Sequence, residues 1–362
     1  MGERQPLFDN AKFAAVALVV CAHTWMPLLA YDRTTAAAVL TVAAFSMPLF
    51  ITLCGYFAQP RPGRPLVDGP RLVGQLAVPY VVFQLLYNVV GMVLERRITP
   101  IPLLEPRWLT WFLLSLLVWR LTVPLWTALR HPLPVAVLVA AASGAVDAFP
   151  PDLAFGRTVG FLPFFVLGLV LRPEHFALLR RPRVRRWGWP VLATVAAGVW
   201  AAAPELLEPG WLEYTDSAAQ LHVSFPVWLG VRAALGLVSL VAGAAFLAVL
   251  PDRRTRFTAL GAASLYVYLL HGLPLKLVQA SGIYHARALH HWWTALPLLG
   301  GCALALAVVL ALPPVVRLLR PLVQPPLGRL LAPQRPQREA DPDRTEHQDR
   351  TERQDRQALG PV

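Results

Sequence analysis

The stretch DNAKFAAVALVVCAHTW, residues 9–25, begins with charged and polar residues, continues through a run of apolar and small residues, and then contains a histidine. The apolar character extends to about residue 30. A membrane-spanning helix needs about 20 mostly apolar residues, so this segment is long enough to span. Because an ionisable side chain is costly inside a membrane span, His23 needs either a packing partner on a neighbouring helix or a functional role.

The rest of the 362-residue chain has the same apolar character. Its residues are 56% hydrophobic and only 15% charged, whereas a soluble domain has about 25% charged residues. The apolar residues form ten blocks: 11–30, 36–58, 72–94, 108–128, 133–149, 158–171, 189–203, 226–250, 259–280 and 294–319. We therefore predict an all-α polytopic integral membrane protein with about ten transmembrane helices.

The connectors between these blocks differ in charge. Arginines concentrate after the second, sixth, eighth and tenth blocks, whereas the connector after the seventh block has four acidic residues and no basic one. The positive-inside rule then predicts a multi-pass protein of the cell membrane with both termini cytoplasmic. Arg96 and Arg97 lie on the predicted outer side and oppose this pattern. The net charge of +12 is explained by these connectors, so we predict no nucleic-acid partner.

The composition changes near the C-terminus. We predict one transmembrane domain over residues 1–331 and a disordered polar cytoplasmic tail over 332–362, where DRTEHQDRTERQDRQ offers nothing apolar to bury. A helical interaction tail is the alternative. The three cysteines lie inside apolar blocks without metal-site spacing, and the adjacent His290 and His291 do not share a helix face, so no metal site is predicted.

Lys12 and His23 are related by helix geometry. They are eleven residues apart, almost three turns, so they share one face and lie roughly 16 Å apart along the axis. Lys12 can then lie at the membrane boundary and His23 near the midplane, while Asp9 can pair with Lys12 on the same face. The sequence therefore predicts a polar track along the first helix.

A second histidine lies at a matching depth. In SLYVYLLHGLP, residues 264–274, His271 lies twelve residues after Ala259, just as His23 lies twelve residues after Ala11. Both helices should cross in the same direction, so we expect the two imidazoles at one level of a shared polar chamber. Histidine is suited to take a proton from an alcohol and release it later.

Five segments in order resemble a known family over about residues 7–320. They are FDNAK with the following histidine (8–23), MPLFITLCGYF (47–57), WFL (111–113), FLPFFVLG (161–168) and SLYVYLLH (264–271). In this pattern the chain resembles the membrane-bound acyltransferase-3 superfamily, and within it the fucose 4-O-acetylase-like branch. It departs from the pattern at Lys12, Ser46, Cys54 and Gln75, where arginine, histidine, serine and a second basic residue are more usual.

The resemblance implies a membrane-bound O-acyltransferase without a permanently bound cofactor. Cytoplasmic acyl-CoA, most often acetyl-CoA, would be the co-substrate, and a carbohydrate or other hydroxylated acceptor of the cell envelope or outside it would receive the acyl group. His23 would be the general base and Lys12 would lie nearer the donor. His271 would bind the acceptor or assist proton transfer.

Further residues are assigned to the two substrates with alternatives left open. Arg71, with Arg61 and Arg64, could contact the CoA phosphates, but Arg71 could equally be a positive-inside anchor. On the outer side, Trp211 in LEPGWLEYTD and Arg157 before FLPFF could hold a sugar, or could belong to an interfacial belt. Lys276 is expected to snorkel.

Two rival functions remain at this stage. A transporter or flippase of a lipid-linked sugar could use the histidines as a proton relay, but no acidic residue lies in the middle of a block and no internal repeat is evident. A non-catalytic membrane scaffold would leave the two histidines inside the membrane without a purpose.

Overall fold

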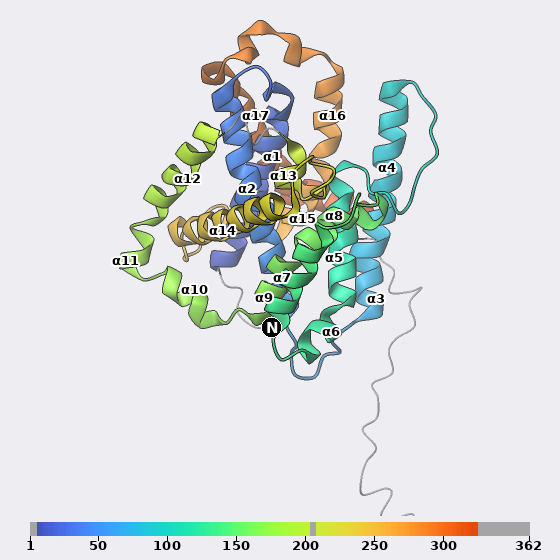
Figure 1. The fold of residues 1–362 in the computed structure, drawn as a ribbon. Helices are drawn as coiled ribbons and strands as arrows, with labels where there is room; N and C mark the ends of the chain where they lie inside the picture. Colours follow the sequence, from blue (N-terminus) through green and yellow to red (C-terminus); the bar gives the residue numbers. More distant parts are fainter. Residues whose placement is uncertain (1–5, 203–207, 325–362) are drawn as a thin grey trace, which may run out of the picture. The chain divides into compact units, whose positions relative to one another are not determined.

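A computed structural model of the chain describes residues 6–202 and 208–324, and every regular element in these ranges is a helix (Figure 1). The predicted polar tail, 332–362, lies outside the described residues. The prediction of an all-α protein is therefore confirmed for the described part of the chain.

Five described helices are long and apolar enough to cross a membrane. They are α1 (Pro6–Trp25) with its short extension to Leu28, α2 (Arg33–Phe57), the continuous segment Gly69–Glu95 that includes α3 (Gly69–Leu72) and α4 (Val78–Glu95), α14 (Phe225–Val249) and α17 (Trp292–Ala311). Two bent pairs also pass: Asp152–Gly160 with Leu162–Val170, bent by 54°, and Thr258–Leu270 with Gly272–Ala280, bent by 41°. The chain is an integral membrane protein with five to seven candidate spans in its described residues.

The remaining helices are shorter. They are α5 (Trp111–Leu121), α6 (Val123–Ala128), α7 (Pro132–Ser143), α8 (Phe155–Gly160), α9 (Leu162–Val170), α10 (Pro173–Leu179), α11 (Pro182–Arg185), α12 (Gly188–Ala202), α13 (Pro209–Glu213), α15 (Ser264–Leu270), α16 (Gly272–Ala280) and α18 (Pro313–Val323). Each of the ten predicted blocks contains helix, but several helices are shorter than the roughly 20 residues of a straight span. The count of ten spans therefore stays a prediction.

Helix α2 packs against α1, α9, α12 and α14. Its approach to α9 is the closest, because two glycines face each other there: a side-chain carbon at Gly168 would overlap the carbonyl oxygen of Thr52, and one at Gly55 would overlap that of Phe165. Small residues let membrane helices gain van der Waals contact through close backbone approach. This contact joins the MPLFITLCGYF and FLPFFVLG segments.

Connectors that the charge pattern assigns to one side of the membrane lie together in the structure. The side chain of Gln59 donates hydrogen bonds to the carbonyls of Gly168, at 3.1 Å, and Leu171, at 2.6 Å. Arg180 forms an ion pair with Asp252, with 3.3 Å between Nε and the carboxylate. These contacts join the connectors that follow the second, sixth and eighth blocks.

The other connectors gather through a separate set of contacts. Arg33 donates to the carbonyl of Trp200 at 2.8 Å, and Arg157 forms an ion pair with Glu213. The hydroxyl of Tyr284 donates to the carbonyl of Thr24 at 3.0 Å. These contacts join the connectors that follow the first, fifth, seventh and ninth blocks, and the assignment of either group of connectors to the cytoplasm stays a prediction from charge.

Candidate active site

The N-terminal end of α1 is fixed by a buried asparagine. Asn10 is 0% exposed, and its amide group donates to the carbonyls of Pro251, at 2.8 Å, and Arg253, at 3.1 Å. Its carbonyl oxygen accepts from the hydroxyls of Thr255, at 3.1 Å, and Thr258, at 2.6 Å. Because Thr258 begins the helical segment that leads to His271, these bonds fix the height of His23 relative to His271.

The predicted charged pair at the start of α1 is present. The ammonium of Lys12 lies 2.8 Å from the carboxylate of Asp9, one turn earlier on the same face. Lys12 is partly exposed, and Asp9 is buried. The pair keeps the Lys12 ammonium close to the cavity described below.

The structure brings His23 and His271 into direct contact. Nδ1 of His23 lies 2.9 Å from Nε2 of His271, and the two rings are nearly parallel, with an angle of 5° and centroids 5.2 Å apart. His271 is fully buried and lies where α15 meets α16, at the 41° bend. The sequence predicted the shared depth of the two rings, and Pro274 is a sequence signal for the bend, because a proline cannot donate a hydrogen bond to the carbonyl of Leu270 four residues earlier.

The hydrogen-bond network assigns the protons of the two neutral rings. Nδ1 of His271 lies 2.9 Å from the carbonyl oxygen of Val267, which can only accept, so this nitrogen carries the hydrogen. Nε2 of a neutral His271 must then accept, and Nδ1 of His23 donates to it. The arrangement leaves Nε2 of His23 with a free lone pair, which is the form that a general base requires.

Trp108 covers the histidine pair. Its ring centroid lies 5.6 Å from that of His23 and 6.4 Å from that of His271. The ammonium of Lys276 lies 4.9 Å from the centre of the Trp108 ring. Lys276 was expected to extend its ammonium toward the membrane surface. In the structure the ammonium lies over the Trp108 ring instead, which places a positive charge near the histidine pair.

A cavity of about 400 Å³ lies near the Lys12 end of α1. Five cationic side chains line it: Lys12, Arg61, Arg64, Arg71 and Arg120. Asp68 is the only acidic residue in its described lining. All four cations that the sequence assigned to the donor side are therefore brought together, and the cavity is strongly electropositive.

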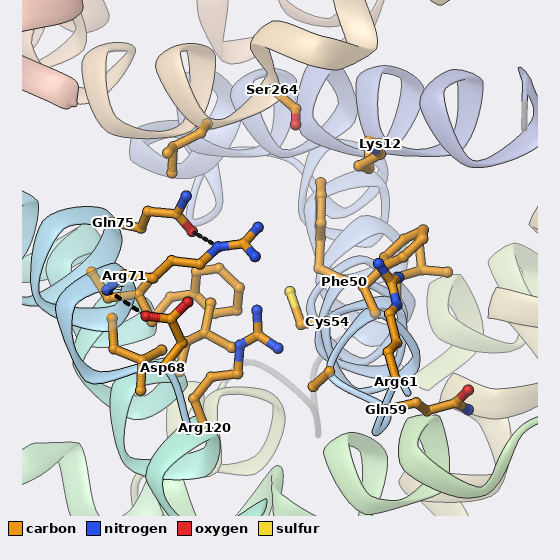
Figure 2. Close-up of a pocket in the computed structure, with 18 of the residues that line it drawn as sticks. Lys12, Phe50, Cys54, Gln59, Arg61, Asp68, Arg71, Gln75, Arg120 and Ser264 are labelled. Atoms are coloured by element: carbon orange, nitrogen blue, oxygen red, sulfur yellow. Dashed lines mark hydrogen bonds between the residues drawn. The ribbon is translucent and has the colours of Figure 1, made fainter. Parts of the chain in front are cut away.

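Figure 2 shows the guanidinium groups of Arg71 and Arg120 pointing into the cavity, with the sulfur of Cys54 facing them. The backbone amide of Arg71 donates to the Asp68 carboxylate at 3.1 Å, and its Nε donates to the side chain of Gln75 at 3.2 Å. Gln75, a departure from the family pattern, thus orients Arg71 instead of adding a charge. Arg120 was missed by the sequence analysis, although an arginine inside an apolar block is a recognisable signal.

Comparison with known families adds an independent observation. A family model described as an acyltransferase domain, acyltransferase-3, matches residues 6–312, which is most of the chain. The chain belongs to the acyltransferase-3 family. No curated protein and no solved structure matches it. The protein is therefore a membrane acyltransferase, and the histidine pair and the cationic cavity are its candidate active site.

Tyr268 relates the cationic cavity of the acyltransferase to its histidine pair. Neither His23 nor His271 lines the cavity, whereas Tyr268 does. The Tyr268 ring lies 6.2 Å from that of His271, packs edge-on against Phe112 at 5.3 Å, and is held by a hydrogen bond from its hydroxyl to the carbonyl of Leu109. Tyr268 therefore lines the cavity and also lies beside His271 in this structure.

The two residues assigned to the acceptor side lie in different surroundings. The guanidinium of Arg157 lies 5.1 Å from the centre of the Trp111 ring and pairs with Glu213 of α13. Trp211, also in α13, packs on Arg232 of α14, with 5.5 Å between guanidinium and ring centre. Arg157 thus lies beside the WFL segment of the acyltransferase, while the Trp211 ring is engaged in a separate contact.

Proposed function

We propose that the protein transfers an acyl group, acetyl by default for the fucose 4-O-acetylase-like branch, from acyl-CoA to a hydroxyl group of a carbohydrate or other envelope or secreted acceptor. The observation that carries this proposal is the hydrogen-bond chain from Val267 through His271 to His23, which leaves Nε2 of His23 as a base. The cation-lined cavity on the other side of Tyr268 supports a donor with several phosphate groups.

We assign the donor to the cationic cavity because of the positive charges that line it. CoA carries several phosphates on a long flexible chain, and guanidinium groups bind phosphate oxygens in bidentate geometry. Arg61, Arg64, Arg71 and Arg120 supply four such groups around one cavity. The pantetheine arm would then extend past Lys12 and Phe112 toward Tyr268, which lies beside His271.

The chemical step uses His23 twice. Nε2 of His23 takes the proton of the acceptor hydroxyl as its oxygen attacks the carbonyl carbon of the thioester. The new C–O bond forms, the C–S bond breaks, and the CoA thiolate leaves with the proton returned by the His23 imidazolium. His271 stabilises that imidazolium by accepting the hydrogen bond from Nδ1.

Tyr268 has to turn aside, or let the thioester pass, for the donor to reach His23. Its hydroxyl is held only by the Leu109 carbonyl among the described residues, and its ring lies between Phe112 and His271. A closed partition before both substrates are bound would protect the thioester from hydrolysis by water from the acceptor side.

The test is transfer of labelled acetyl from acetyl-CoA to the membrane and polymer fractions of cells that produce the protein. His23→Ala should lower transfer by about 10²–10⁴-fold, because it removes the base, while the amount of inserted, monodisperse protein stays the same. The exposed Arg183→Ala serves as the matched control and should transfer normally. A His23→Ala protein that keeps more than about a tenth of wild-type transfer would show that His23 is not the base.

A second measurement identifies the acceptor class. Mass spectrometry of envelope glycans and secreted products, from cells with and without an active gene, should show loss of a modification whose mass equals that of the transferred acyl group. Loss from a glycan would support the carbohydrate acceptor. An unchanged set of products, together with no use of acetyl-CoA by membranes, would contradict acyl transfer by this chain.

A further inference from the structure

A second cavity, of about 380 Å³, lies between α7, α8, α9 and α14 and shares no lining residue with the cationic cavity. Its walls are almost wholly apolar and include Val137, Ala141, Phe164, Leu167, Gly236 and Leu240. The proposed reaction uses no part of it. Its chemistry therefore needs a separate explanation.

Helices of very different length border the cavity. With 12 residues α7 is well below the length of a span, whereas α14 has 25. At the cavity, Val137 is 48% exposed and Leu237 is 63% exposed. Such apolar surfaces on an integral membrane protein face hydrocarbon, and an apolar cavity does not hold water, so a hydrocarbon chain is the natural occupant.

One wall of the cavity is charged. Arg232, only 8% exposed, donates to the carbonyls of Gly210, at 2.9 Å, and Asp216, at 3.1 Å, and also to that of Trp211. Its guanidinium lies 4.3 Å from the ring centre of Tyr214. Within residues 6–202 and 208–324, Nε of Arg232 has no hydrogen-bond partner, and the ion pairs found there do not involve it.

We propose that this cavity binds one hydrocarbon chain of an anionic phospholipid, with the phosphate group at the Arg232 end. A buried guanidinium surrounded by carbonyl dipoles and aromatic faces still carries a full positive charge, and in a low-dielectric environment that charge attracts an anion strongly. Phosphate is the anion that membrane lipids supply, and arginine is the side chain best suited to bind it. The chain of the same lipid extends along Gly236 and Leu240.

Two glycines of α14 give a matched pair of variants. A side-chain carbon at Gly236 or at Gly230 would meet no atom within 4 Å, but only Gly236 lines the cavity. A side chain at Gly236 therefore starts in open space at the cavity wall, where the ring of Gly236→Phe takes room that a lipid chain would need, and Gly230→Phe adds the same ring to the same helix elsewhere. The full-length proteins are purified in mild detergent, and bound phospholipid is measured by native mass spectrometry.

We expect wild type and Gly230→Phe to retain one phospholipid, and Gly236→Phe to lose at least about four-fifths of it. Equal retention by the two variants, no retained phospholipid in the wild type, or a retained lipid of another class would each overturn the proposal. Acyl transfer is measured separately, so this result does not depend on the proposed reaction.

The preference for an anionic head group is tested without a substitution at Arg232. After delipidation, phosphatidylglycerol should raise the melting temperature of the wild type more than phosphatidylcholine with identical chains, because only the former has net negative charge to pair with Arg232. Gly236→Phe should lose this difference and Gly230→Phe should keep it. Equal stabilisation of the wild type by both lipids would overturn the assigned role of Arg232.

Discussion

At the residue scale, the structure separates the roles of the two histidines. His23 is partly exposed and has a free Nε2, whereas His271 is fully buried with both ring nitrogens engaged, by Val267 and by His23. In the proposed reaction His23 would therefore be the residue that touches a substrate, and His271 would act as a positioning residue. Helix register and loop charge were enough to predict that the rings share a depth. Their hydrogen-bond direction depends on the Val267 carbonyl, which no sequence pattern identifies.

The role of His271 gives a specific kinetic prediction. His271→Ala should lower kcat for acetyl transfer by about 10–100-fold, as removal of a supporting hydrogen-bond partner typically does, with little change in KM for acetyl-CoA. His271→Gln should retain more activity than His271→Ala, because an amide oxygen can still accept from Nδ1 of His23. Equal losses in both variants would contradict the positioning role.

The cationic cavity gives a second prediction at this scale. Arg120→Ala and Arg71→Ala should each raise KM for acyl-CoA by about tenfold, since each removes a charge-assisted contact with phosphate, while kcat changes less. Steady-state kinetics over a range of acetyl-CoA concentrations measures both constants, with the exposed Arg183→Ala as control. An unchanged KM for Arg71→Ala would show that Arg71 does not contact the donor, and would favour the alternative that it only fixes the orientation of the chain in the membrane.

At the element scale, the apolar blocks predicted the positions of the helices well. They did not predict the points at which a block divides into two helices. The tenth block is broken at Leu312, between α17 and α18, because Pro313 and Pro314 cannot donate backbone hydrogen bonds, so α18 begins as a separate helix. The ninth block bends at His271 within an unbroken apolar run. Pro274 is a local cause of that bend, because it has no N–H to donate to the Leu270 carbonyl, and the hydrogen bond from the Tyr87 hydroxyl to the Leu269 carbonyl, at 2.8 Å, adds a tertiary contact beside it.

The contact between α2 and α9 gives a prediction about stability. Gly168→Ala should destabilise the protein by about 1–3 kcal/mol, because the added carbon would force apart two backbones in close contact. Gly198→Ala is the matched control, since an added carbon there meets nothing within 4 Å. Thermal unfolding in detergent should show a lower midpoint for Gly168→Ala alone. An unchanged midpoint would show that the two helices can separate at little cost.

At the scale of the whole molecule, orientation decides whether the proposed donor can reach its cavity. Acyl-CoA is cytoplasmic, so the end of the protein with Lys12, Arg61 and Arg71 must face the cytoplasm. The structure joins this end to the arginine-rich connectors through Asn10 and through the Arg180–Asp252 ion pair. The positive-inside rule assigns these connectors to the cytoplasm, which is the orientation that the proposed donor needs.

Cysteine labelling of intact cells measures this orientation, with Cys21 left in place because it is buried. In a variant with Cys54 and Cys302 replaced by serine, a cysteine at exposed Glu208 should react with a membrane-impermeant maleimide from outside. A cysteine at exposed Arg183 should react only after permeabilisation. Glu208 is preferred to Gly210, where a side chain would overlap Asp216. The reverse pattern would place the cationic cavity outside the cell, where no acyl-CoA is present, and would exclude it as the donor site whatever the histidine variants show.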